Sequence, residues 1–230
     1  MTDPLIYLSG ICPYDPGKIL ATVRGDAYFA VMLSDGKIGV CSTLNGKSGS
    51  DPLQVSTIDL NMEDHRVFQL AYANAVLNYA QEYPQSGDIF DLVEFKKDLP
   101  TVMIGYFPPL VQKFRKAGLP LQIFDLRKID PDILPIEELP ESVRNARQVV
   151  VTSTSIVNQS FTGILSHSVS GSDLYLLGPS TPLNEGFKTT FGIQRLFGMV
   201  FEPYEFAVLD RIGQGLGTQS FSTFGEKVSL

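Results

Sequence analysis

Apolar and turn-forming residues near the N-terminus follow the pattern of a β-hairpin. Residues 27–33 and 38–42 are apolar runs of strand length, and Asp35-Gly36 lies in the turn between them. Such a turn between two apolar runs is a strong short-range hairpin signal. Residues 63–80 contain no Gly or Pro and are apolar around much of a helical circumference, which predicts a long, largely buried helix.

From residue 101 onward, short apolar runs alternate with helical segments. The predicted strands are 101–105, 121–125, 148–152, 173–177 and 196–201, and the predicted helices are 110–117, 156–167 and 203–212. This alternation favours a doubly wound, mainly parallel sheet, and strands that are apolar on both faces indicate helices on both sides. The Gly-rich stretch 213–217 follows a helix, so it is expected to connect to a last strand near Lys227.

These patterns predict an α/β protein with two parts. Residues 1–98 are expected to form a small α+β domain, because antiparallel strands are followed by a helix. Residues 99–230 are expected to form a Rossmann-like doubly wound domain with a mainly parallel sheet.

The charge of the chain narrows the choice of partners. Its 18 Lys and Arg against 25 Asp and Glu give a net charge of −7, which repels nucleic acid and anionic membranes, so neither is expected as a partner. No apolar run approaches the roughly 18 residues of a membrane span. The N-terminus lacks a secretory pattern, and the two cysteines suggest no disulfide framework, so a cytoplasmic location is expected.

Candidate binding residues lie in the loops that follow the predicted strands. Ligands of open parallel sheets bind at the carboxyl ends of the strands, and here those loops are rich in Gly and hydroxyl side chains. Each loop also has a local structural alternative. Ser155 is placed to cap a helix that begins at Ile156, and Thr181 before Pro182 has the pattern of an N-cap. The concentration of hydroxyls at one edge nevertheless favours a site for a polar or anionic ligand.

Asp125 follows Gly105 by twenty positions, roughly where a dinucleotide-binding fold places the acidic residue for ribose hydroxyls. The loop after the first strand lacks G-x-G-x-x-G and carries two prolines, so a classical NAD(P) cofactor is disfavoured. A smaller adenosine-type ligand stays open. The alternative role for Asp125 is to cap nearby backbone at the end of its strand.

Two further residues belong to the first part of the chain. Asn74 lies in line with apolar positions of the helix 63–80, so its amide is expected to be buried and to need a partner, within the fold or in a ligand at the cleft. Cys41 ends a strand of the hairpin, where a buried apolar role is the more common one. No metal-ligand spacing links Cys41 to His65 or His167.

Five segments, in this order, resemble the DUF4213 and DUF364 family, whose name refers to heavy-metal chelation. They are LAYANAVLN at 70–78, VMIGYFPPLV at 102–111, VVTSTSIVN at 150–158, LLGPSTPL at 176–183 and FGMV at 197–200. The resemblance implies an N-terminal domain like the small domain of enolases, a Rossmann-like domain, a site in the cleft between them, and a homo-oligomer. Carried over by position, it marks Asn74, Gly105, Phe107, Pro108, Thr152, Ser153, Asn158, Gly178, Pro179, Ser180 and Thr181 as ligand-binding.

The leading hypothesis is therefore the binding of a small polar or anionic ligand, or of a metal or metal chelate, in the inter-domain cleft. A divalent or heavy metal bound directly would draw on Cys41 with Asp125 or Glu202. Soft metals prefer thiolate or imidazole, so the hydroxyl-rich loops suit a polar organic ligand better. The alternatives are an enzyme, a lyase or transferase that uses an adenosine-type ligand at Asp125, and a non-catalytic scaffold.

Overall fold

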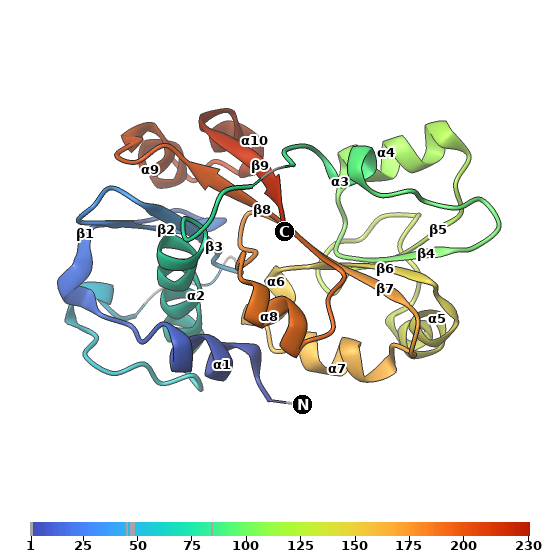
Figure 1. Ribbon diagram of the computed structural model, residues 1–230, viewed down its shortest axis with the longest axis horizontal. Coiled ribbons are helices and arrows are strands. Elements are labelled where there is room, and N and C mark those ends of the chain that lie inside the picture. The colour runs from blue at the N-terminus through green and yellow to red at the C-terminus, as the bar shows by residue number, and fades with distance from the viewer. Residues whose placement is uncertain (1, 45, 47–48, 84) are drawn as a thin grey trace.

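The computed structural model describes residues 2–44, 46, 49–83 and 85–230, which form two β-sheets with helices around both (Figure 1). The first sheet is antiparallel in the order β1-β2-β3. Its strands are β1 (Ile19–Arg24), β2 (Tyr28–Leu33) and β3 (Ile38–Ser42). The predicted hairpin is thus confirmed, and Gly36 makes its turn with a φ of 85°.

Helices cover both faces of this three-stranded sheet, because its strands alternate between two apolar layers. Helix α2 (Glu63–Leu77) packs on one face and ends three residues earlier than predicted. The other face lies against α9 (Phe206–Gly213) and α10 (Thr218–Phe221), which come from the opposite end of the chain (Figure 1). Helix α1 (Pro4–Ile11) packs on α2.

The second sheet has the order β5-β4-β6-β7-β8-β9, with all strands parallel except the last. Its strands are β4 (Thr101–Ile104), β5 (Leu121–Phe124), β6 (Gln148–Thr152), β7 (Asp173–Leu177), β8 (Arg195–Phe201) and β9 (Gly225–Ser229). The α/β fold class is confirmed. The strand order reverses between β4 and β6, because β5 and β7 lie on their outer sides, and this is where such folds bind ligands.

Helices also cover both faces of the second sheet. Val149 and Val151 point to a layer that contains α5 (Leu139–Asn145), α7 (Phe161–His167) and α8 (Glu185–Thr190). Val150 points to the opposite layer, with α3 (Ile89–Leu92) and α4 (Pro108–Ala117). Gly118 ends α4 in the left-handed conformation, as its position after the helical pattern predicts. No helix in the described part of the chain has the length and hydropathy that crossing a bilayer requires.

Four sequence predictions about helices and their caps are wrong in detail. The helix predicted over 156–167 is two helices, α6 (Thr154–Val157) and α7, because Gln159 turns the chain with a φ of 65°. Ser155 therefore lies inside α6 and donates to the Thr152 carbonyl at 2.6 Å instead of capping a helix. Thr181 caps nothing, since the next helix, α8, begins at Glu185 with Asn184 as its N-cap. The helix predicted over 203–212 begins at Phe206.

Candidate functional site

A cavity of about 950 Å³ opens at the carboxyl ends of β4, β6 and β7, where the strand order reverses. Its size is typical of small-molecule sites. Ten of the twelve residues predicted to bind ligand line it: Gly105, Phe107, Pro108, Asp125, Thr152, Ser153, Asn158, Gly178, Pro179 and Ser180. Loops that are far apart in the sequence therefore meet at one edge of the sheet.

The other two predicted residues, Asn74 and Thr181, are buried outside the cavity lining. Asn74 donates from Nδ2 to the Val40 carbonyl at 3.0 Å, which fastens α2 to β3. One helical turn later, Asn78 donates to the Thr181 carbonyl at 3.1 Å and accepts from the Leu183 N–H at 2.8 Å. The two asparagines of α2 thus anchor the helix to β3 and to the segment after β7.

Two glycines let the loops approach each other closely. Gly105 and Gly178 have φ values of 99° and 137°, a region that other residues rarely adopt. A Cβ on Gly105 would lie 2.7 Å from Thr152 Cβ, and one on Gly178 would lie 2.7 Å from Ser153 Oγ. The loop after β6 therefore packs directly against the loops on both sides, and neither glycine position has room for a side chain.

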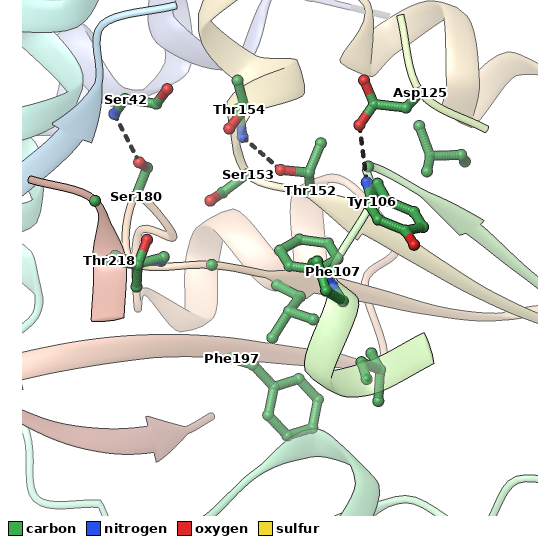
Figure 2. A pocket seen from close by; sticks show the side chains of 18 of the residues that line it. Ser42, Tyr106, Phe107, Asp125, Thr152, Ser153, Thr154, Ser180, Phe197 and Thr218 are labelled. Carbon is green, nitrogen blue, oxygen red and sulfur yellow. Dashed lines mark hydrogen bonds between the residues drawn. The ribbon is translucent and has the colours of Figure 1, made fainter. Parts of the chain in front are cut away.

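Buried hydroxyls gather where the two parts of the molecule meet. Ser180 Oγ accepts from the Ser42 N–H of β3 at 3.0 Å, which links the two sheets. Ser153 is 1% exposed, and its hydroxyl has no hydrogen-bond partner among the described residues. Figure 2 shows this hydroxyl between Ser180 and Phe107. A buried hydroxyl without a protein partner at a cavity wall is a group ready to bond a ligand.

Asp125 holds two of the loops together. Its Oδ2 accepts from the Tyr106 N–H at 2.8 Å (Figure 2). Its Oδ1 accepts from the Arg127 and Lys128 N–H groups at 2.8 and 2.9 Å. Burial raises the pKa of the carboxyl, but these three donors and the Lys128 charge outweigh it, so the pKa lies below its ordinary 3.8. Both oxygens are engaged by backbone, as expected from the capping alternative.

The cavity also contains residues that the sequence did not single out. They include Tyr28 and Ser42 from the first sheet, Arg127 and Lys128 after β5, and Leu216, Gly217, Thr218, Gln219, Ser220 and Lys227 near the C-terminus. The adjacent cations after a predicted strand were a usable signal. The C-terminal residues were not, because only the return of the chain to the first sheet brings 216–220 to this edge.

Arg127 and Lys128 lie at the cavity and form no ion pair with a carboxylate in the described part of the chain. Arg127 donates to the Leu44 carbonyl. Lys128 donates to the Tyr106 carbonyl at 3.0 Å, and its Nζ lies 5.3 Å from the centre of the Tyr106 ring. By contrast, Lys227 is paired with Asp88 at 3.4 Å.

The donor set does not fit a soft metal ion. Cys41 is fully buried, donates to the Ser42 carbonyl at 3.4 Å, and has a pKa that burial raises. Glu202 is exposed, and neither residue lines the cavity. Across residues 2–44, 46, 49–83 and 85–230, no three His, Cys, Asp or Glu side chains are placed to hold a metal, and the cavity lining contains no Cys, His or Glu.

Two solved structures of similar fold are among those that match the chain. The chain is similar to a DUF364-family protein of unknown function from Pyrococcus horikoshii, with 17% identity, a TM-score of 0.79, and coverage of 99% of this chain and 98% of that chain. It is also similar to one from Desulfitobacterium hafniense DCB-2, with 18% identity, a TM-score of 0.75, and coverage of 99% and 97%. At these identities the likeness shows the fold alone.

Sequence comparison identifies the family. No curated protein matches the chain. The model of the DUF364 family, described as "Putative heavy-metal chelation", matches residues 88–230, more than half of the 230 residues. The chain therefore belongs to the DUF364 family.

Proposed function

We propose that the cavity binds a small organic ligand whose polar or anionic group is held by the loops after β4, β6 and β7. The Ser153 hydroxyl carries this proposal, because Ser153 is only 1% exposed and lines the cavity, and no hydrogen bond joins its hydroxyl to a described residue. The nearby N–H of Ser180 also has no acceptor there. Two such donors at a cavity wall favour a ligand with hydrogen-bond acceptors.

The charges at the cavity favour a ligand of negative charge. Three cations, Arg127, Lys128 and Lys227, line the cavity with only two carboxylates, Asp88 and Asp125, in a chain whose net charge is −7. A cationic spot on an acidic protein concentrates anions locally and repels cations. Direct capture of a metal cation is disfavoured on the same ground.

The family description and the lining are compatible if a metal enters as a chelate. The organic part of a chelate would meet the hydroxyls and amides of the cavity, whereas a bare soft ion would find no thiolate or imidazole there. The ligand class that the lining supports best is therefore an organic acid, free or in complex with a metal.

A thermal-shift panel on protein purified without an affinity tag tests the proposal. We expect citrate, oxalate or another small carboxylate to stabilise the native chain, and Ser153→Ala to weaken that binding roughly tenfold, since a hydrogen bond to a charged group is lost. Ser166→Ala, at an exposed serine of α7, serves as the matched control. Stabilisation by bare Zn²⁺ or Ni²⁺ alone, equal in both variants, would overturn the proposal.

Three sequence predictions are carried forward as proposals: the cytoplasmic location, the homo-oligomer, and the division into residues 1–98 and 99–230, in which α9 of the second part covers one face of the first sheet. Light scattering tests the oligomer, and cell fractionation tests the location.

A further inference from the structure

One face of the six-stranded sheet lacks a helix beside the cavity. After β8 the chain returns to this sheet only as the edge strand β9, because α9 packs on β1 and β2 instead of on this sheet. Leu177 of β7 and Phe197 of β8 are paired in register, so they share a face, and Met199 follows Phe197 on the same side. All three line the cavity, and we name them the apolar floor.

An aromatic side chain stands beside this floor. Phe107, in the loop after β4, is half-buried and lines the cavity. Among the described residues it forms no aromatic pair, whereas Phe197 pairs with Tyr175 at a centroid distance of 6.3 Å. Figure 2 places the Phe107 ring between Thr152 and Phe197. A ring without a stacking partner at a cavity wall offers its face to a planar ligand.

The size of the cavity supports a ligand with a substantial body. A lone oxyanion would fill only a small part of about 950 Å³, and it would make no use of the apolar side chains that line the rest. The floor and the Ser153 hydroxyl belong to one continuous cavity, so a single molecule can reach both.

We propose that the ligand is a planar aromatic or heteroaromatic acid. Its ring lies on the apolar floor beside Phe107, and its acidic group binds Ser153 and the Ser180 N–H. This inference rests on the proposed function, since it concerns the same cavity, and it adds the class of the molecule.

Carboxylates that each carry one acidic group but differ in their ring separate the contribution of the ring to binding from that of the acidic group. Acetate, benzoate and 2-naphthoate are titrated into the full-length protein by calorimetry. We expect benzoate to bind at least about tenfold more tightly than acetate, and 2-naphthoate more tightly again, because each ring buries apolar surface.

Two variants locate the ring. Leu177→Trp fills the floor, so benzoate and 2-naphthoate should no longer bind more tightly than acetate. Phe107→Leu keeps an apolar side chain but removes the ring, so it should reduce that advantage by roughly threefold to tenfold. Phe206→Leu, at a residue of α9 that is 51% exposed and outside the lining, is the matched control.

The outcomes separate the two proposals. One outcome is that acetate binds, with its binding weakened by Ser153→Ala, while the aromatic acids bind no more tightly than acetate. In that case the inference of an aromatic ligand is wrong and the proposed function stands. If none of the three acids binds, both fail. If Leu177→Trp does not fold, Phe107→Leu decides, and an unchanged ratio of benzoate to acetate affinity in it overturns the inference.

Discussion

Arg66 is a charged side chain that the fold encloses almost completely, at 1% exposure. It pairs with Asp3 at 2.8 Å and donates to the carbonyls of Ile156 and Val157 at 2.7 and 2.8 Å. Those carbonyls belong to α6, which directly follows Ser153. A residue of the first half of the chain therefore fixes a loop of the candidate site.

Replacing Arg66 should destabilise the fold strongly, because the substitution leaves Asp3 and the α6 carbonyls without their hydrogen-bond partner. We expect Arg66→Met to lower the free energy of unfolding by about 3–5 kcal/mol, measured by urea denaturation. Lys18→Met breaks an exposed ion pair with Asp15, so it should change the free energy of unfolding by less than about 1 kcal/mol. Equal effects of the two substitutions would contradict this role for Arg66.

Asp125 makes the stability depend on pH in a predictable direction. Its pKa is lower in the folded chain than its ordinary 3.8, so its hydrogen bonds stabilise the fold fully above that value. This contribution is lost as the pH falls through the lower, folded pKa. The stability difference between the native chain and Asp125→Asn should therefore be largest near neutral pH and shrink below about pH 4, measured by urea denaturation across pH.

Asp125 and Asn74 also show what residue patterns can reveal. Backbone capping was one of the two roles predicted for Asp125, and it caps three N–H groups; Asn74 was predicted to need a partner, and its Nδ2 has one in the Val40 carbonyl. Which partner each one takes depends on neighbouring loops and strands, which a single sequence does not specify.

At the scale of elements, the loops after β4, β6 and β7 pack closely on one another. We expect Gly178→Ala to destabilise the protein by about 1–3 kcal/mol, because its φ of 137° is unfavourable for alanine and the new Cβ would meet Ser153 Oγ at 2.7 Å. The same substitution should weaken ligand binding by displacing Ser153.

The control is Gly163→Ala in α7, where a Cβ meets nothing within 4 Å. Alanine there should leave the thermal midpoint unchanged or raise it, since glycine inside a helix costs about 0.5–1 kcal/mol. A destabilisation of the same size at both glycines would show that loop packing is not the cause.

The missed elements have physical reasons as well. Strand β1 is an edge strand whose side chains are mostly half-buried, so it lacks a strong apolar alternation. Helix α1 has Leu5 and Leu8 buried but Ile6 and Ile11 exposed, which blurs its apolar stripe. Strands of the parallel sheet were predictable because both of their faces are buried.

At the scale of the whole molecule, the two ends of the chain build one layer. Met32 and Ile38 of the first sheet lie against Val208, Leu209 and Ile212 of α9, all nearly inaccessible to solvent. Patterns in the sequence predicted both sheets, but not that α9 leaves the second sheet to cover the first. Because they did not indicate this path of α9, the sequence patterns also failed to predict the apolar floor and the C-terminal lining of the cavity.

A fragment of residues 1–98 should therefore not fold alone, although the hairpin and α2 lie within it. We expect poor amide dispersion in its NMR spectrum, because the outer face of the sheet would be exposed to water. In the full chain, Ile212→Ala should cost about 2–5 kcal/mol by opening a cavity in this layer. A well-dispersed, cooperative fragment would refute the dependence on α9.

The position of α9 near the end of the sequence also determines when the first sheet can be covered during synthesis. The hairpin strands are complete by residue 42, but the helix that covers their outer face is made only at residues 206–213. For most of translation that face has no cover, and a nascent chain with bare apolar surface is prone to aggregation. Maturation of the N-terminal sheet must therefore wait until almost the entire polypeptide has left the ribosome.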